Sequence, residues 1–441
     1  MKTDTMKNNK SRNYRTRDFL KLFQISFFPI SLLLVIFVLV LEADAQTGDI
    51  THVHDPCIIK CDDYYYIFST GDRLAVRRSK DLIDWEFIGS VFNTIPSWGK
   101  KEVPGVTNIW APDIFYHDGT YYLYYSLSTF GSNRSCIGFA TNVTLDPDDL
   151  NYKWVDQGKV FQSEPGKDNF NAIDPNIVMD DSGKIWMSFG SFWGGIKMVE
   201  LDSTTWKAKS DGLLYSIASR SGVNAIEAPF IIYKNGYYYL FVSFDFCCKG
   251  VESDYKIMVG RSDRIIGPYI DRYGKSMMDG GGNLLLSGYG RWRGPGHCAV
   301  LLERELSWLI HHAYDAEKNG IATLQVRPLG WDKDGWTLAG ELIQEIQEVP
   351  TNVPTRYALY QNFPNPFKST TTIKYDLPEL TNVSLSIYDI RGNLVEILVN
   401  EQKMNFSYYK MWDAGAFSSG VYFCRMIAGD YTATKKLIIV R

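Results

Sequence analysis

The sequence predicts an all-β protein in which a five-bladed β-propeller is followed by a small C-terminal β-sandwich. Three observations predict this fold class: a high aromatic content, a hairpin pattern that recurs through the middle of the chain, and a change of pattern near its end. Aromatic residues make up 15% of the 441 residues, with 28 Tyr, 24 Phe and 12 Trp. Aromatic residues favour strands. The length is typical of two or three domains, and a net charge of −4 indicates no nucleic-acid partner.

The first 45 residues are expected to be a secretory signal peptide. Basic residues precede an apolar run over 22–41, and Ala43-Asp44-Ala45 supplies the small residues of a cleavage site. An uncleaved membrane anchor is the alternative, because the run is about long enough to span a bilayer. The seven cysteines show no metal-binding spacing and are expected to be small buried apolar residues. The adjacent pair Cys247-Cys248 could form a bond only through a strained link.

A pattern of an apolar strand, a tight turn and an aromatic strand recurs five times between residues 46 and 349. Asp-Gly, Ser-Gly and Asn-Gly pairs at the turns are signals for short hairpins, because Gly accepts positive φ. A period of roughly 55–70 residues indicates a repeat architecture, and hairpin repeats of this kind are typical of propeller blades around a channel. A long β-sandwich is the alternative. The five apolar strands begin near Asp55, Ala111, Asp174, Glu227 and Gly296.

Blade symmetry is expected to gather acidic residues at one mouth of the channel. An Asp before Pro is also a common turn starter, but equivalent acids in several repeats favour a functional site. Neighbouring carboxylates raise one another's pKa. A protonated carboxyl group that faces an ionised carboxylate can act with it as the general acid and general base of glycoside hydrolysis. A separation of roughly 6.5–9.5 Å would give inversion, and about 5–5.5 Å retention. The residues expected at this mouth are Asp55, Asp113, Asp174, Glu227 and His297.

Aromatic residues near the same strand ends suit a sugar ligand. Trp110, Phe130 and Trp193 are predicted to cover sugar faces, and Gly131 lets the backbone approach the ligand. The other aromatic residues are expected to be core. The chain shows no Walker loop, dinucleotide fingerprint, HExxH motif or nucleophile elbow.

Long motifs over residues 48–346 resemble glycoside hydrolase family 43, and in particular its endo-α-1,5-L-arabinanases. Cys298 stands where relatives would carry Asn. The motifs are His54-Asp55-Pro56, Asn108-Ile109-Trp110-Ala111-Pro112-Asp113, Asn171-Ala172-Ile173-Asp174-Pro175-Asn176, Ser191-Phe192-Trp193-Gly194-Gly195, Ala225-Ile226-Glu227-Ala228-Pro229-Phe230 and Arg291-Trp292-Arg293-Gly294-Pro295-Gly296-His297.

The resemblance implies a five-bladed enzyme that hydrolyses arabinan with inversion. Asp55 would be the general base, Glu227 the general acid, and Asp174 the residue that raises the pKa of that acid. His297 would bind a metal, usually calcium, together with water. A monomer is expected. The resemblance places Gly131, Asn171, Ala172, Ile173, Ser191, Phe192 and Trp193 at the substrate site, and Trp110, Asp113 and Phe130 are expected there from their positions in the repeat.

Two other functions stay open on the same fold. One is an exo-acting α-L-arabinofuranosidase or β-xylosidase, which would release only monomers. The other is a non-catalytic carbohydrate-binding propeller. The presence of all three acids, Asp55, Asp174 and Glu227, favours an enzyme over a binding protein.

The pattern of the chain changes after residue 349. Residues 350–356 read as a linker, and 357–441 carry short alternating strands that predict a β-sandwich. A carbohydrate-binding or fibronectin-like module is one interpretation. The block resembles the sorting domain of type IX secretion cargo in Asn362-Phe363-Pro364-Asn365-Pro366, Ile387-Tyr388-Asp389 and Ser419-Gly420-Val421-Tyr422. The resemblance implies export through the periplasm to the outer cell surface or the medium, and a module dispensable for catalysis.

Overall fold

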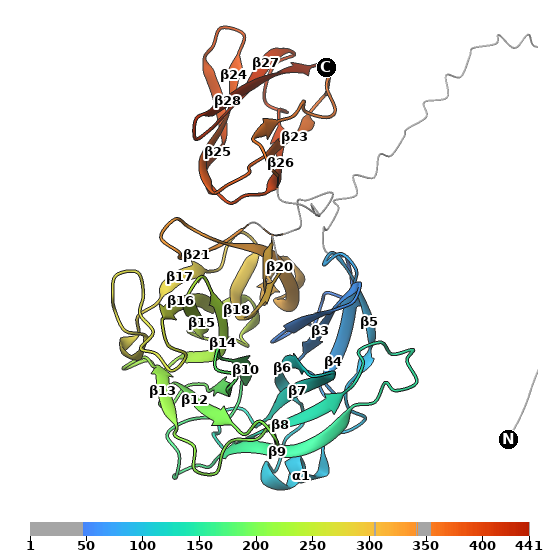
Figure 1. Ribbon diagram of the computed structural model, residues 1–441. Helices are drawn as coiled ribbons and strands as arrows, with labels where there is room; N and C mark the ends of the chain where they lie inside the picture. Colours follow the sequence, from blue (N-terminus) through green and yellow to red (C-terminus); the bar gives the residue numbers. More distant parts are fainter. Residues whose placement is uncertain (1–46, 304–305, 341, 343–353, 441) are drawn as a thin grey trace, which may run out of the picture. The chain divides into compact units, whose positions relative to one another are not determined.

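The computed structural model describes residues 47–303, 306–340, 342 and 354–440 (Figure 1). These residues form seven β-sheets. The short helices among them are α1 (Ser97–Glu102), η1 (Gly250–Glu252), η2 (Met277–Asp279) and η3 (Ala316–Lys318). The all-β prediction is therefore confirmed. The predicted signal peptide and residues 350–353 of the predicted linker lie outside the described residues. No helix of the described part is long and apolar enough to cross a membrane.

Five sheets, one for each copy of the repeat, follow one another along residues 47–339. Each is antiparallel with its strands in chain order, and the first also pairs β1 in parallel with β5. The first sheet holds β1 (Thr47–Gly48), β2 (Cys57–Cys61), β3 (Tyr64–Ser69), β4 (Ala75–Ser79) and β5 (Asp84–Ser90). The second holds β6 (Trp110–His117), β7 (Thr120–Leu127), β8 (Ser135–Asn142) and β9 (Val155–Ser163). The third holds β10 (Asn176–Met179), β11 (Ile185–Phe189), β12 (Ile196–Leu201) and β13 (Tyr215–Ala218). The fourth holds β14 (Ile226–Lys234), β15 (Tyr237–Phe244), β16 (Lys256–Ser262) and β17 (Asn283–Leu286). The fifth holds β18 (Trp292–Leu302), β19 (Ser307–Asp315), β20 (Ile321–Trp331) and β21 (Thr337–Ala339).

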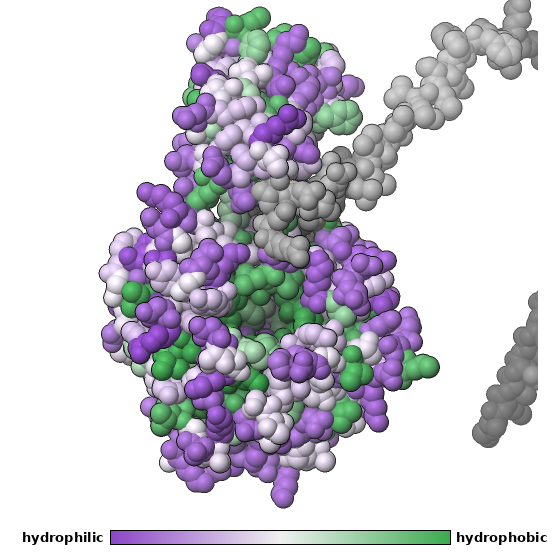
Figure 2. All heavy atoms as spheres, viewed as in Figure 1, coloured by the Kyte–Doolittle hydropathy of each residue, from purple (hydrophilic) through white to green (hydrophobic). Residues whose placement is uncertain are grey.

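The first strands of the five sheets lie next to one another around a common centre (Figure 1). Strand β2 contacts β6, β6 contacts β10, β10 contacts β14, β14 contacts β18, and β18 contacts β2. The space-filling view shows a hollow at this centre with hydrophobic residues around it (Figure 2). Because residues from distant repeats end at the same centre, this arrangement can build one site from all five sheets.

A separate hydrophobic layer fills the space between each pair of neighbouring sheets. The layer between the second and third sheets, for example, contains Tyr124, Phe139, Met187 and Phe189. The tight hairpins follow from the turn residues: Asn235 and Gly236 between β14 and β15 both have positive φ, at 52° and 85°. Two consecutive left-handed residues make the turn whose twist matches that of paired strands.

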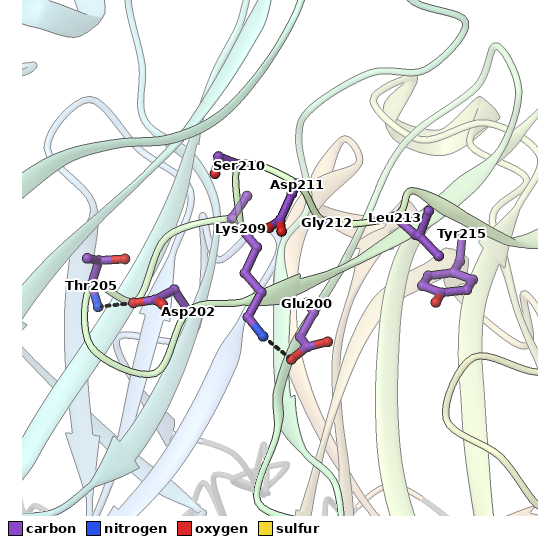
Figure 3. A pocket seen from close by; sticks show the side chains of 10 residues that line it. Glu200, Asp202, Thr205, Lys209, Ser210, Asp211, Gly212, Leu213 and Tyr215 are labelled. Atoms are coloured by element: carbon purple, nitrogen blue, oxygen red, sulfur yellow. Dashed lines mark hydrogen bonds and ion pairs between the residues drawn. The ribbon is translucent and has the colours of Figure 1, made fainter.

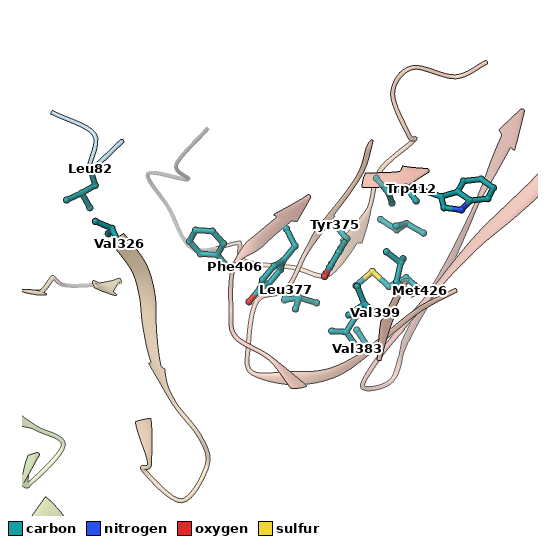
Figure 4. Packing of buried hydrophobic residues seen from close by; sticks show 14 of the residues in the cluster. Leu82, Val326, Tyr375, Leu377, Val383, Val399, Phe406, Trp412 and Met426 are labelled. Atoms are coloured by element: carbon teal, nitrogen blue, oxygen red, sulfur yellow. The ribbon is translucent and has the colours of Figure 1, made fainter. Parts of the chain in front are cut away.

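Two further sheets make up the C-terminal region. One has the order β22 (Ala358–Leu359), β23 (Thr370–Asp376) and β26 (Ser407–Asp413). The other has the order β25 (Leu394–Lys403), β24 (Thr381–Asp389), β27 (Gly420–Ala428) and β28 (Tyr431–Ile439). Side chains from both sheets form one core, in which Tyr375, Leu377, Val383, Trp412 and Met426 are almost fully buried (Figure 4). This arrangement matches the predicted β-sandwich.

The expectation that all cysteines are buried and free is wrong for one pair. Cys247 and Cys248 are joined by a disulfide bond in the loop after β15, and Cys248 is exposed. Adjacent cysteines can pair because this loop turns sharply, with Cys248 at φ 65°. The other five are free, and all except the half-buried Cys61 are buried.

Candidate active site

Each of the five first strands has one residue in the left-handed conformation, either just before the strand or at an irregularity in its register. These residues are Asp55, Ala111, Asp174, Ala228 and His297, with φ of 50°, 41°, 57°, 56° and 47°. Left-handed φ is unfavourable for residues other than Gly, so five such residues at equivalent places mark a shared backbone requirement. Glu227 comes one residue before this position in its repeat, and Asp113 comes two residues after it.

The backbone N–H of each left-handed residue is held by a side chain outside its own sheet. For four of them the acceptor is a side chain on a strand or in a loop of the preceding sheet, where the fifth sheet counts as preceding the first. Asp55 donates to His312 Nδ1 (3.2 Å), Ala111 to Thr70 Oγ1 (2.8 Å), Asp174 to Ser126 Oγ (2.9 Å) and His297 to Ser243 Oγ (2.8 Å). The fifth, Ala228, donates to Asp174 Oδ2 at 3.1 Å. The carboxylate of Asp174 therefore holds the backbone beside Glu227.

Asp55 is a buried carboxylate surrounded by imidazole and hydroxyl groups. Its Oδ1 lies 2.8 Å from His54 Nδ1 and 3.2 Å from His297 Nδ1, and its Oδ2 accepts a hydrogen bond from Thr70 Oγ1 at 2.6 Å. Burial alone would raise the pKa of Asp55, but His54 and His297 outweigh it and hold that pKa well below its usual range. Burial likewise opposes the charged form of His297, yet Asp55 raises the pKa of His297 to about 9. Asp55 is thus ionised throughout the neutral range.

Glu227 has the opposite electrostatic environment. Its Oε2 accepts a hydrogen bond from Ser191 Oγ at 2.6 Å. Burial, followed by the negative charges of Asp174 and Asp55, raises the pKa of Glu227 to about 8, despite the opposing hydrogen bond from Ser191. Burial also raises the pKa of Asp174, to about 6. At neutral pH Glu227 carries a proton and Asp55 does not, which is the division between an acid and a base that hydrolysis requires.

Asp113 belongs to a hydrogen-bond network that links sheets. Its Oδ2 accepts from Asn176 Nδ2 (3.2 Å) and from the backbone of Ile177 (2.7 Å), and Asn176 Oδ1 accepts from Ile231 N (2.8 Å). Burial raises the pKa of Asp113 to about 7. These bonds join the second, third and fourth sheets, so the carboxylate of Asp113 stabilises the contacts between their first strands.

The predicted sugar-facing aromatic residues form an exposed group on the second sheet and a strained loop on the third. Phe130 is 81% exposed, and its ring meets that of Trp110 edge-on with 6.4 Å between centroids. Gly131 has φ 76°. In the loop after β11, Phe192 and Trp193 both have positive φ (50° and 40°). That loop also carries Ser191, the partner of Glu227, so it lies beside the acid cluster.

Three further residues predicted at the substrate site are buried directly before Asp174. Asn171 Oδ1 accepts from Ser135 Oγ at 2.6 Å, and Ala172 N donates to Ser163 Oγ at 2.9 Å. The carbonyl of Ile173 accepts from Gly190 N at 2.8 Å. These hydrogen bonds fix the loop that presents Asp174.

Sequence reasoning missed three residues that surround Asp55: His54, His312 and Tyr314. The rings of His54 and His312 stack with 3.9 Å between centroids, and His54 Nε2 lies 2.7 Å from the hydroxyl of Tyr314. His54 directly precedes Asp55 in the motif His54-Asp55-Pro56, and His312 and Tyr314 lie on the aromatic strand of the fifth repeat. Their position on that strand was the available signal, but it did not reveal which of them faces Asp55.

A surface pocket of about 770 Å³ lies away from these groups (Figure 3). It is lined by residues around β12 and β13, including Glu200, Asp202 and Tyr215, and an ion pair joins Lys209 to Glu200. None of the predicted site residues lines it. The carboxylates at the centre of the five sheets therefore remain the candidate active site.

Comparison with known proteins assigns the chain to a family. The model described as glycosyl hydrolases family 43 matches residues 50–337. The chain belongs to this family. It is a glycoside hydrolase with an additional C-terminal region, residues 361–440, that matches the secretion system C-terminal sorting domain. As a protein with this sorting domain, the family 43 enzyme is secreted or held at the cell surface.

Three relatives illustrate the similarity of this family 43 member to known enzymes. An extracellular endo-α-(1→5)-L-arabinanase of Bacillus subtilis is 47% identical over 290 residues, which cover 64% of this chain and 86% of that protein. An extracellular exo-α-(1→5)-L-arabinofuranosidase of Cellvibrio japonicus is 43% identical over 300 residues, covering 66% and 86%. The solved structure of an endo-arabinanase from Bacillus licheniformis has a TM-score of 0.62 at 50% identity, covering 66% and 99%.

Proposed function

We propose that this enzyme cleaves internal α-1,5-L-arabinofuranosidic bonds of arabinan, the side chain of plant cell-wall pectin, with inversion at the anomeric carbon. The observation that carries the proposal is the contrasting environment of two buried carboxyl groups: Asp55 pairs with His54 and His297, whereas burial and the charges of Asp174 and Asp55 raise the pKa of Glu227. The two relatives described above, an endo-arabinanase and an exo-arabinofuranosidase, suggest the substrate class.

The proposed reaction is a single displacement. The proton of Glu227 moves to the glycosidic oxygen as the bond from that oxygen to the anomeric carbon breaks. Asp55 removes a proton from a water molecule, whose oxygen attacks the opposite face of the same carbon. Asp174 keeps Glu227 protonated through its negative charge and fixes the adjacent backbone through Ala228. Proton exchange with solvent restores both groups.

We further propose that the five sheets are the blades of a closed five-bladed propeller spanning residues 46–349. The cyclic contacts of the first strands, with β18 against β2, support this arrangement. The hydrogen bond from Asp55 N to His312 Nδ1 joins the first sheet to the fifth. The proposed linker is 350–356 and the proposed sorting module 357–441.

Substitution of each proposed acid and base tests the mechanism. Asp55→Asn and Glu227→Gln are expected to lower kcat on linear arabinan by about 10²–10⁴, because each removes a positioned proton-transfer group. Asp202→Asn, at the separate surface pocket, is the matched control. If either variant keeps most of the wild-type kcat, the assignment is wrong. Binding of arabinan without any hydrolysis by the unmodified protein would favour a carbohydrate-binding role.

Exo-action is the second candidate, because one relative is named as an exo-acting arabinofuranosidase. The two modes differ in their first products. Endo-cleavage of linear arabinan gives mixed oligosaccharides early in the reaction, whereas exo-cleavage releases short products of one size from chain ends. Chromatography of products at low conversion distinguishes them.

A calcium ion bound by His297 and water is proposed from the family resemblance. The donor set limits how it could bind. Nδ1 of His297 is paired with Asp55 at 3.2 Å, so one ring nitrogen is left, and calcium prefers oxygen ligands. The residues therefore fit only an ion whose shell is mostly water, and such an ion would add positive charge near the carboxylates. A chelator that changes neither the melting temperature nor the activity would refute the calcium proposal.

Export is proposed to follow the type IX route, with the signal peptide directing the chain to the periplasm and the sorting domain directing it across the outer membrane. The enzyme is proposed to act as a monomer. Deletion of residues 357–441 in the producing cell should leave the enzyme in the periplasm. Light scattering measures its mass in solution.

A further inference from the structure

The disulfide between Cys247 and Cys248 has no part in the proposed reaction, yet it lies against the residues behind Asp55. It closes a sharp turn after β15, and Cys248 is exposed to solvent. The Sγ of Cys248 lies 3.8 Å from His54 Nε2. All seven cysteines of the chain are described, and this is the one disulfide among them.

A continuous series of hydrogen bonds leads from this turn to Asp55. The backbone N–H of Cys248 donates to the hydroxyl oxygen of Tyr314 at 2.8 Å. The same hydroxyl lies 2.7 Å from His54 Nε2, and His54 Nδ1 lies 2.8 Å from Asp55 Oδ1. One assignment of protons satisfies every link: Tyr314 donates to Nε2 of His54, and the Nδ1–H of His54 donates to Asp55.

Neighbouring groups restrict the middle of this series. The ring of His54 stacks on that of His312, which is fully buried and accepts the backbone N–H of Asp55. Tyr314 is also buried. The turn at Cys248 is the exposed end of the series, and its backbone N–H helps, together with the side chain of Ser253, to hold the hydroxyl of Tyr314 in place.

We propose that the Cys247–Cys248 turn is a positioning element for the general base, acting through Tyr314 and His54 on the carboxylate of Asp55. The inference rests on the proposed role of Asp55. A disulfide between adjacent residues restricts the turn, and thereby fixes the direction of the Cys248 N–H. Misplacement of a catalytic group by about 1 Å can cost a large part of the rate, so loosening the turn should lower kcat rather than weaken substrate binding.

The test combines one variant with chemical reduction. A dithiol reductant breaks the S–S bond: two electrons and two protons pass to the cysteines, which become thiols, and the dithiol is oxidised to its own disulfide. Tyr314→Phe removes only the hydroxyl that links the turn to His54. Both changes are expected to lower kcat on linear arabinan about tenfold, the effect of one hydrogen bond, with KM unchanged. Reduction of the Tyr314→Phe variant should cause no further loss.

Controls separate positioning from folding. Tyr269→Phe removes another buried hydroxyl, which donates to the carbonyl of Ile265 at 2.7 Å outside the site, and should keep wild-type kcat. Circular dichroism of each sample checks that it is folded. An unchanged kcat in Tyr314→Phe, or a reductant effect that is as large in that variant as in the wild type, would overturn the inference. An active Asp55→Asn enzyme would instead overturn the proposed function.

Discussion

Replacement of Asp174 by Asn provides the sharpest test of the electrostatics of the site. The amide keeps an oxygen that can accept the N–H of Ala228, now bonded to Asp174 Oδ2 at 3.1 Å, but it carries no charge. Burial is the largest cause of the raised pKa of Glu227, and the charge of Asp174 comes next. Removing that charge must therefore lower the pKa of Glu227.

The size of the change follows from Coulomb's law. Two carboxylates about 6–9 Å apart at an effective dielectric constant of about 20 repel by roughly 2–3 kcal/mol. One pKa unit corresponds to about 1.4 kcal/mol, so the pKa of Glu227 should fall by about 1.5–2 units from its value of about 8. At pH 7 the protonated fraction would drop from about 0.9 to about 0.1–0.25, and the rate would fall about four- to tenfold through protonation alone.

The assay is kcat/KM on linear arabinan between pH 4 and 10. In the wild type, activity should be lost as the pH rises through about 8, because Glu227 then loses its proton. In Asp174→Asn the midpoint of this alkaline loss of kcat/KM should move to about pH 6–6.5. The kcat/KM of this variant should recover toward the wild-type value near pH 5. The surface variant Asp202→Asn is the control. A limb that stays near pH 8 in Asp174→Asn would refute the idea that Asp174 raises the pKa of the acid.

Three other predictions concern the acid, the substrate and the C-terminal module. Ser191→Ala removes a hydrogen bond that lowers the pKa of Glu227, so the alkaline limb of kcat/KM should move to higher pH, opposite to Asp174→Asn. Phe130→Ala should raise KM for arabinan about tenfold with little change in kcat, because an exposed aromatic ring that could contact the sugar is lost. Tyr273, which is similarly exposed, provides the control variant Tyr273→Ala. An unchanged KM in Phe130→Ala would count against a sugar contact. Trp412→Ala should destabilise the sandwich by about 3–5 kcal/mol in urea unfolding without changing kcat, whereas its exposed neighbour Met411→Ala should change neither.

The repeat made much of the fold predictable. Tight-turn pairs such as Asn235-Gly236 determine local hairpins, and each predicted hairpin is present in its own sheet. Asp55 and Asp174 could be chosen as candidate site residues because both precede Pro at the same point of the repeat. That position is left-handed in the structure, a property that the Asp-Pro pairs alone did not reveal.

Contacts between distant repeats were the part that could not be predicted. His54 and Tyr314 are separated by 260 positions, and only the packing of the fifth sheet against the first brings them together. The carboxylate of Asp113 looked equivalent to the other acids, but it lies two residues beyond the left-handed position and bonds to the neighbouring sheet. Pairing of Cys247 with Cys248 depends on a local turn that no composition rule specifies.

The bond between Asp55 N and His312 has a consequence for biosynthesis. Asp55 is made early, while its acceptor arrives more than 250 residues later, in the last repeat. A growing chain on the ribosome, or one threading through an export channel, therefore lacks the support of its water-activating residue until the final repeat has emerged and docked. Hydrolytic capability is therefore expected to arise only once all five repeats have folded together.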